Sequence, residues 1–170
     1  MKFSKRITGM QASPIRKLVP YATEAKANGK KVYHLNIGQP DIATPAGFFD
    51  AVKNFKEDVL AYSTSAGSNE LIDAIRKYYE GYGIEYGREH IIITNGGSEA
   101  LMFAMIALCD PGDEILVPEP FYTNYNGFGQ AVNVVIKPIT TKAECGFHLP
   151  PVQEIEKALT ANTKAILMSN

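Results

Sequence analysis

A glycine pair followed by serine, Gly96-Gly97-Ser98, stands between a short apolar run and a long apolar segment. Glycine allows close approach of the main chain to a ligand and positive φ angles. The first turn of a helix presents N–H groups without intrahelical partners and the positive end of the helix dipole. The segment therefore predicts an anion site, most often for phosphate, to which the Ser98 hydroxyl adds a donor. A plain turn in which Ser98 only caps the helix is an equally open interpretation.

A second candidate is the stretch Pro118-Glu119-Pro120, which is followed by Phe121 and Tyr122. It comes directly after an apolar run, and its two prolines restrict the main chain. An aromatic ring at the carboxyl end of a strand can stack on a flat ligand. Packing of these rings in the core or at its rim remains the more common role.

Other chemistries find no support in the spacing. The three histidines, His34, His90 and His148, lie far apart, and neither Cys109 nor Cys145 has a partner at metal-ligand spacing. We interpret both cysteines as free thiols in a reducing compartment. The glycine pair is followed neither by the Lys-Ser or Lys-Thr of a phosphate-binding P-loop nor by a hydrolase nucleophile elbow. No metal site is therefore expected.

The composition is that of a soluble globular protein. The 170 residues are 45% hydrophobic and 21% charged, with a net charge of −1, so the basic excess of a nucleic-acid-binding protein is missing. The longest apolar run, from Ala100 to Cys109, is shorter than the ~20 residues that span a membrane. The basic N-terminal segment lacks a signal-peptide core, and a solvated arm fits it better than a transit peptide. We expect a cytoplasmic protein with neither nucleic acid nor membrane as a partner.

Hydrophobic periodicity and turn residues predict the elements that must position these candidates. Helices are expected at residues 14–28, 45–55, 69–79, 98–109, 121–131 and 150–159, and extended runs or strands at 32–37, 91–94, 114–117, 133–139 and 164–168. Pro20 is expected to kink the first helix or delay its start. The alternation of strand and helix after residue 91 predicts crossovers and a largely parallel sheet, with ligands beyond the carboxyl ends of its strands.

Five motifs together resemble one family, the fold-type I pyridoxal-phosphate aminotransferases of class I/II, near the aspartate aminotransferases. They are 35–41 (LNIGQPD), 62–67 (YSTSAG) with Glu70-Leu71, 94–101 (TNGGSEAL), 110–114 (DPGDE) and 118–122 (PEPFY). The resemblance implies an α/β fold, a three-layer sandwich with a mostly parallel sheet. Residues 1–45 would form an N-terminal arm and small-domain segment, and residues 46–170 the first part of the cofactor-binding large domain.

The resemblance also implies roles for the candidate residues. Gly96, Gly97 and Ser98 resemble the cradle for the phosphate of pyridoxal 5′-phosphate. Tyr122 stands where the family has the aromatic residue that stacks on the pyridine ring, and its neighbour Phe121 is a less favoured candidate.

Two more residues acquire roles in the same way. Gly38 resembles the glycine whose main chain meets the α-carboxylate of the substrate. Tyr62 resembles the tyrosine that reaches the phosphate of the other subunit's cofactor, which implies a homodimer with shared active sites and with the basic arm packed on the partner. The implied substrates are an amino acid, with aspartate favoured, and a 2-oxo acid such as 2-oxoglutarate.

The remaining catalytic residues of the family are not matched in this sequence. The Schiff-base lysine, the aspartate at the pyridine nitrogen and the arginine for the substrate carboxylate lie beyond Asn170, so we expect the chain alone to be inactive. Two alternatives stay open. One is another fold-type I enzyme with the same cofactor, such as a C–S lyase, and the other is a non-catalytic phosphate-binding or interaction domain on this scaffold.

Overall fold

The structure is a computed structural model that describes residues 2–169. They divide into two compact units, one made of the residues up to 33 and from 95 onward, and one made of residues 34–94. The division expected from the resemblance, at residue 45, stays a prediction.

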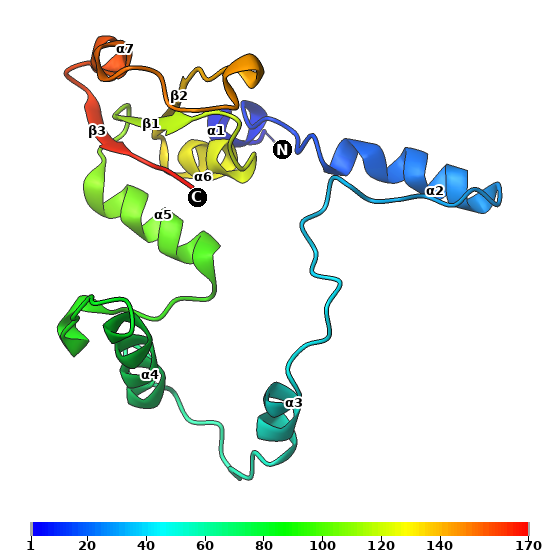
Figure 1. The fold of residues 1–170 in the computed structure, drawn as a ribbon, viewed down its shortest axis with the longest axis vertical. Coiled ribbons are helices and arrows are strands. Elements are labelled where there is room, and N and C mark those ends of the chain that lie inside the picture. Colours follow the sequence, from blue (N-terminus) through cyan, green and yellow to red (C-terminus); the bar gives the residue numbers. More distant parts are fainter. Residues whose placement is uncertain (1, 170) are drawn as a thin grey trace. The chain divides into compact units, whose positions relative to one another are not determined.

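The first unit is built on a parallel sheet of β1 (Glu114–Pro118), β2 (Val135–Ile139) and β3 (Thr163–Ile166). The strand order is β2-β1-β3, and both neighbours of β1 run parallel to it (Figure 1). The three strands therefore share one edge at which all their carboxyl ends lie.

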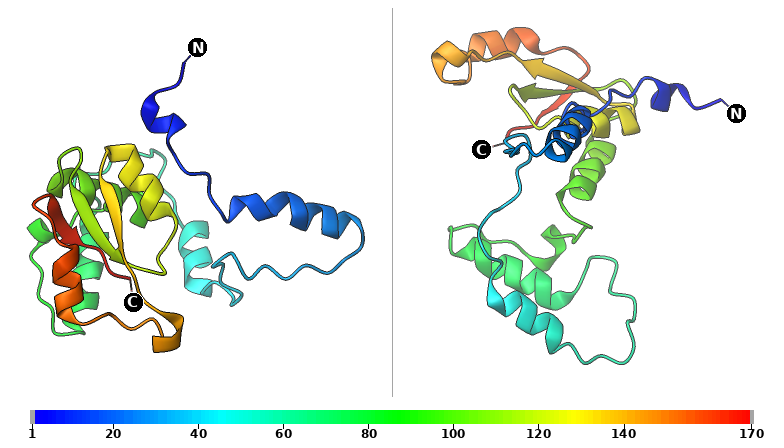
Figure 2. Two further views of the ribbon diagram at one scale, coloured as in Figure 1. Left: turned by 90° about the horizontal axis from the view of Figure 1, so that it is seen from above. Right: turned by 90° about the vertical axis from the view of Figure 1, so that its right-hand side faces the viewer.

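Helices cover both faces of this sheet. The helices α5 (Gly97–Leu108) and α6 (Asn124–Val132) lie on one face and α7 (Val152–Ala158) on the other, as Figure 1 and the right-hand view of Figure 2 show. The core under α5 and α6 is made of the buried residues Met105, Ile115, Val117, Tyr125 and Val134. The α/β architecture of three layers around a parallel sheet is thus confirmed for this part of the chain.

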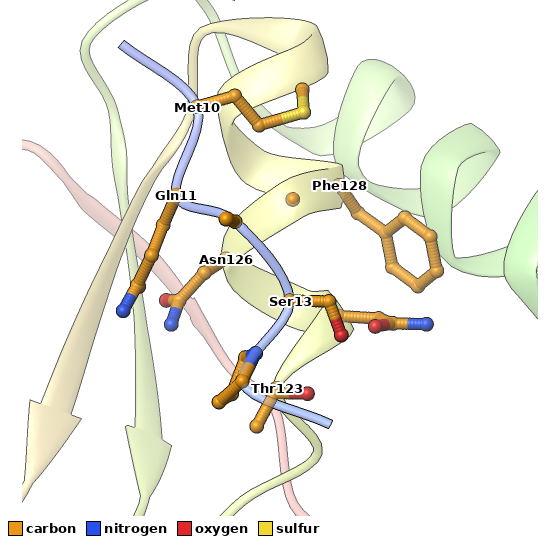
Figure 3. Close-up of a pocket in the computed structure, with 10 residues that line it drawn as sticks. Met10, Gln11, Ser13, Thr123, Asn126 and Phe128 are labelled. Atoms are coloured by element: carbon orange, nitrogen blue, oxygen red, sulfur yellow. The ribbon is translucent and has the colours of Figure 1, made fainter. Parts of the chain in front are cut away.

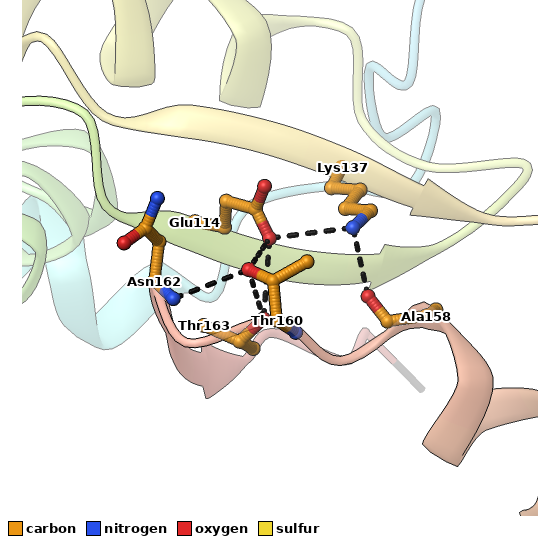
Figure 4. Close-up of polar contacts among 6 residues, drawn as sticks. All are labelled: Glu114, Lys137, Ala158, Thr160, Asn162 and Thr163. Atoms are coloured by element: carbon orange, nitrogen blue, oxygen red, sulfur yellow. Dashed lines mark hydrogen bonds and ion pairs between the residues drawn. The ribbon is translucent and has the colours of Figure 1, made fainter.

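A polar cluster ties α7 and β3 to the other two strands (Figure 4). Glu114 Oε2 accepts hydrogen bonds from Thr160 Oγ1 at 2.7 Å, Thr163 Oγ1 at 3.2 Å and Lys137 Nζ at 3.3 Å. Lys137 Nζ also donates to the carbonyl oxygen of Ala158, at the end of α7, at 2.8 Å. The hydrogen bond from Thr160, and then the ammonium group of Lys137, lower the pKa of Glu114. The cluster lies at the amino ends of β1 and β3.

The two glycines of α6 have different surroundings. A Cβ atom on Gly129 would lie 2.8 Å from both the carbonyl oxygen of Val134 and Ile136 Cγ1, so the helix approaches the start of β2 too closely for a side chain. A Cβ atom on Gly127 would meet nothing within 4 Å. The helix expected at 121–131 is present and begins at Asn124. Packing requires glycine at position 129 but not at position 127.

The N-terminal arm contains the short α1 (Lys5–Thr8), the 3₁₀ turn η1 (Arg16–Leu18) and α2 (Val19–Ala27). Gln130 of α6 donates from Nε2 to the carbonyl oxygen of Arg6 at 3.3 Å, which places α1 against α6. Pro20 occupies the first turn of α2, where its missing N–H is not needed. The helix therefore starts later than Pro14, as the position of Pro20 allowed.

The second unit contains α3 (Ala46–Lys53), α4 (Asn69–Glu80) and the 3₁₀ turn η2 (Arg88–His90). Ser68 caps α4, because its Oγ accepts from the main-chain N–H of Leu71 at 3.2 Å. Ile72 is the buried apolar residue of this helix. Asp73 accepts a hydrogen bond from Arg88 Nε at 2.9 Å, and this arginine lowers the pKa of the carboxyl group. The ion pair joins α4 to η2.

The prediction of a strand at residues 91–94 is wrong for the described residues. The segment is extended, but the main-chain N–H of Ile93 donates to the carbonyl oxygen of Ala66 at 2.8 Å, in a loop and not in a neighbouring strand. β-Branched residues indicate fit to a pleated surface, while a strand also needs a hydrogen-bonding neighbour. The extended run at 32–37 likewise joins no sheet in the described part of the chain.

Gly67 allows the loop before α4 to pack closely against this extended segment. Its φ angle is +109°, and a Cβ atom at this position would lie 2.3 Å from Ile93 Cγ1. Both the backbone angle and the close contact therefore demand glycine. The loop expected at 62–68 is confirmed, and the remaining loop at 140–148 contains one short 3₁₀ turn, η3 (Ala143–Cys145).

Candidate functional site

The turn before α5 leaves the start of this helix open. Gly96 is the N-cap residue with a φ angle of +79°, and no side chain caps the helix. A Cβ atom on Gly96 or Gly97 would meet nothing within 4 Å. Glycine at position 96 is therefore favoured by its positive φ angle and not by close packing. Ser98 is exposed in the first turn. In a helix, the first N–H groups, here those of Gly97 and Ser98, have no partner within the helix, and with open space at the glycine Cβ positions this arrangement suits an oxyanion.

Glu99 stabilises the turn from the helix side. Its Oε2 accepts a hydrogen bond from the main-chain N–H of Asn95 at 2.6 Å. The carboxylate lies in the first turn of α5, where the helix dipole favours negative charge. An anion bound at Gly97 and Ser98 would share the end of the helix with this group.

Phe121 and Tyr122, at the carboxyl end of β1, divide their roles. Phe121 packs against the core and stacks on the ring of Tyr125, with ring centroids 6.1 Å apart. Tyr122 is 49% exposed. Its ring forms a T-shaped pair with the ring of Tyr125, with ring centroids 5.6 Å apart and an angle of 89° between the planes, and its hydroxyl oxygen accepts a hydrogen bond from Asn124 Nδ2 at 2.6 Å. Of the two aromatic residues, Tyr122 is the more exposed and therefore the better candidate for contact with a ligand.

The cradle and Tyr122 flank the same core. Leu101, one turn after Ser98, and Phe121, the neighbour of Tyr122, both pack against the cluster that contains Met105 and Val117. The start of α5 and the aromatic residue after β1 are therefore held by one packed unit.

A cavity of about 500 Å³ opens at the carboxyl ends of β1 and β3. This is the edge of the sheet at which the sequence predicts ligand binding. Its lining is mainly apolar, with the carboxylate of Glu119 among it, and consists of Val117, Pro118, Glu119, Pro120, Phe121, Phe147, Leu149, Met168 and Ser169.

A second cavity, of about 560 Å³, lies between the arm and the first turns of α6 (Figure 3). Residues 10–14 cross α6 there, and the other lining comes from residues 123, 124 and 126–128. The side chains are uncharged. Thr123 Oγ1 is buried and has no hydrogen-bond partner among the described residues.

Gly38 and Tyr62 belong to the second unit. Gly38 is exposed in a segment without helix or strand, and a Cβ atom there would meet nothing within 4 Å. The side chain of Tyr62 is fully exposed, at 104% of its reference surface. The glycine pair, Ser98 and Tyr122 thus belong to the first unit, whereas Gly38 and Tyr62 belong to the second.

Other kinds of site find no counterpart in the described residues. Within residues 2–169, no group of three or more histidine, cysteine or acidic residues is placed to hold a metal ion. No helix of this part of the chain is long and apolar enough to cross a membrane. Both cysteines are free, and burial raises the pKa of the Cys109 thiol, as expected for a core residue that does not act as a nucleophile.

Comparison with known sequences gives a consistent result. The model of the family "Aminotransferase class I and II" matches residues 30–170. A curated relative from Methanocaldococcus jannaschii, (5-formylfuran-3-yl)methyl phosphate transaminase, is 34% identical over 98% of this chain and 43% of its own length. An aspartate aminotransferase from Rhizobium meliloti is 33% identical over 98% of this chain and 41% of its own length.

Solved structures agree with the sequence matches. The crystal structure of an aspartate aminotransferase from Rhizobium meliloti superposes with a TM-score of 0.85 at 30% identity, over 98% of this chain and 42% of that one. An alanine aminotransferase from Pyrococcus furiosus gives a TM-score of 0.87 at 35% identity, over 97% of this chain and 43% of that one. The chain thus spans a little over two fifths of the length of these relatives.

Proposed function

Because the chain belongs to the class I and II aminotransferase family, we propose that it is the N-terminal part of a pyridoxal-phosphate-dependent aminotransferase. The enzyme would transfer an amino group between an amino acid and a 2-oxo acid. Aspartate is the favoured amino acid, and 2-oxoglutarate the favoured acceptor, because aspartate aminotransferases recur among the relatives. The similar alanine and furan-phosphate transaminases show how widely the substrates of such relatives differ.

The observation that carries the proposal is the open start of α5. Gly96 turns the chain with a positive φ angle, and neither Gly96 nor Gly97 places a side chain over the first turn. The N–H groups of Gly97 and Ser98 and the hydroxyl of Ser98 are donors suited to a phosphate dianion. These residues fit the phosphate end of pyridoxal phosphate.

Tyr122 fits the flat part of the same cofactor. Its half-exposed ring stands beyond β1, on the packed unit that also holds the start of α5. When bound, pyridoxal phosphate supplies an electron sink that stabilises negative charge at the α-carbon of an amino acid. The work of this chain is to hold and orient that group through the donors at Gly97 and Ser98 and through the ring of Tyr122. The lysine that anchors the cofactor in the family is matched by none of the five motifs.

Gly38 and Tyr62 complete the proposal. The exposed main chain at Gly38 would meet the α-carboxylate of the substrate. Tyr62 would reach the cofactor phosphate of a second subunit in a cytoplasmic homodimer, and the full exposure of its side chain supports a partner outside its own chain. The basic arm would pack on the same partner.

Binding of pyridoxamine 5′-phosphate to the chain tests the phosphate cradle. This probe has no aldehyde and does not react with surface lysines, and its fluorescence reports binding. Ser98→Ala removes a hydroxyl donor and is expected to weaken binding about tenfold, the value of a hydrogen bond to a charged group. Gly97→Ala keeps the main-chain N–H but places a methyl group over the open first turn, and it is also expected to weaken binding. Gly47→Ala is the matched control, because Gly47 is also a helical glycine with nothing within 4 Å of its Cβ position. Equal affinity in all variants, or no saturable binding, would overturn the proposal.

A transamination assay tests the activity. With pyridoxal phosphate, aspartate and 2-oxoglutarate, the 170-residue chain alone is expected to form no oxaloacetate. A protein that carries this sequence at the length of its relatives is expected to form it. Oxaloacetate production by the isolated chain, in a preparation free of other enzymes, would contradict the assignment of the catalytic groups to the rest of the protein.

A further inference from the structure

We propose that Asn124 is a positioning residue that fixes the ring of Tyr122 for stacking on the cofactor. This inference rests on the proposed function, since it takes Tyr122 as the stacking residue. In this role, the Asn124 side chain holds the ring in place, and the Tyr122 hydroxyl group serves as the acceptor of its hydrogen bond.

The geometry around Tyr122 provides two points of attachment. Its ring forms a T-shaped pair with the ring of Tyr125, with ring centroids 5.6 Å apart and an angle of 89° between the planes. The outer end is held by the hydrogen bond that Asn124 Nδ2 donates to the hydroxyl oxygen at 2.6 Å. The first contact limits the position of the ring, and the second limits its rotation.

Both attachments have rigid supports. Tyr125 is 8% exposed and belongs to the buried core, where Phe121 stacks on it. Asn124 is the first residue of α6, so its main chain is fixed by the helix that follows. The hydrogen bond therefore connects Tyr122 to the start of α6, a helix that packs on the core through Tyr125 and Phe128.

A half-exposed tyrosine needs such a restraint. At 49% exposure, the ring is held only in part by packing, and any freedom that remains is lost when a planar ligand stacks on it. A side chain that is already in the binding orientation avoids that loss, which appears as higher affinity. Stacking itself uses only the ring face. The hydroxyl of Tyr122 then has a separate role, as the acceptor for Asn124.

A double-mutant cycle on pyridoxamine 5′-phosphate binding tests the inference. Asn124→Ala and Tyr122→Phe each remove the hydrogen bond and are expected to weaken binding about two- to tenfold. The double variant should bind no more weakly than either single variant, because both changes delete the same interaction. Tyr122→Ala, which removes the ring, should weaken binding further.

Asn126→Ala is the matched control, because Asn126 is an asparagine of the same helix and has no contact with the Tyr122 hydroxyl in the structure. It should leave affinity unchanged. Asn124→Asp keeps a partner for the hydroxyl, now as an acceptor, and should recover most of the affinity lost in Asn124→Ala. The circular dichroism of the bound probe should weaken in Asn124→Ala and return in Asn124→Asp, since it depends on the orientation of the ring against the ligand.

These variants distinguish failure of the proposed function from failure of the positioning role of Asn124. If Gly97→Ala and Tyr122→Ala both leave binding unchanged, the proposed function fails, and the inference fails with it. If Tyr122→Ala weakens binding but Asn124→Ala does not, the proposed function stands and the positioning role is wrong. Additive effects of Asn124→Ala and Tyr122→Phe, or loss of affinity in Asn126→Ala, would also overturn the positioning role.

Discussion

The same substitution, glycine to alanine, is expected to have opposite effects at two positions of α6. Gly127 and Gly129 are both interior residues of this nine-residue helix. In an otherwise neutral site, alanine stabilises a helix relative to glycine by ~0.5–1 kcal/mol, because the unfolded chain has less freedom to lose. The Cβ position of Gly127 is open, so Gly127→Ala should gain this amount.

Gly129→Ala gains the same helix contribution but creates a clash. Its Cβ would lie 2.8 Å from the carbonyl oxygen of Val134 and 2.8 Å from Ile136 Cγ1. The carbonyl belongs to the main chain at the start of β2 and cannot rotate away as a side chain can. Overpacking of this kind destabilises by ~1–3 kcal/mol. Because the helix contribution cancels between the variants, their free energies of unfolding should differ by ~1–3 kcal/mol, Gly127→Ala being the more stable.

Urea unfolding of the chain, followed by far-ultraviolet circular dichroism, measures the difference. The midpoint should rise for Gly127→Ala and fall for Gly129→Ala, with little change in the slope of the transition. Equal shifts in the same direction would refute the close approach of α6 to β2. A lower midpoint for Gly127→Ala than for Gly129→Ala would refute it more strongly.

Three further predictions concern other parts of the chain. Gly67→Ala should destabilise the chain by ~2–5 kcal/mol, because it combines a strained positive φ angle with a clash against Ile93. Gly83→Ala has a positive φ angle but open space around its Cβ position, so it should destabilise by only ~1–2 kcal/mol. The urea midpoints of the two variants measure the difference, and equal losses of stability would contradict the contact between Gly67 and Ile93. The lowered pKa of Glu114 means that its stabilising contribution is present above its ordinary value of 4.5 and is lost as the pH falls through the folded value. Glu114→Gln should therefore reduce the free energy of unfolding at pH 7. Between pH 7 and pH 3, the variant should lose less of its stability than the unchanged chain does. A pH dependence equal to that of the unchanged chain would argue against the cluster. Ser68→Ala removes the cap of α4 and should lower the free energy of unfolding by ~1 kcal/mol, measured as a lower urea midpoint. An unchanged midpoint would mean that water replaces the hydroxyl group.

The elements were predictable where local chemistry determines them. The helix expected at 69–79 and the strand expected at 114–117 carry their signals in the sequence, and the structure has α4 and β1 there. The failure at 91–94 has a physical cause. An apolar, β-branched run favours an extended conformation, but a strand also needs a hydrogen-bonding neighbour, which is often distant in the sequence. Here the main-chain N–H of Ile93 donates its hydrogen bond to Ala66 in a loop.

The candidate site shows the same limit. The glycine pair and the aromatic residues were found by type and spacing. The contact from Asn124 to Tyr122 was not, because an asparagine two residues after a tyrosine has many other possible partners. The cluster around Glu114 joins residues up to 49 positions apart, and no pattern in the sequence pairs them. Tertiary packing alone brings these groups together.

The cluster of Glu114, Lys137, Thr160 and Thr163 has a consequence for protein engineering. It fastens the strands at their amino ends, whereas Tyr122 and the cavity beyond β1 lie at the opposite ends of the same strands. Substitutions separated in this way and sharing no partners usually combine additively. The amino end of the sheet is thus a place where heat resistance could be increased by design without changes at the end where we propose that the ligand binds.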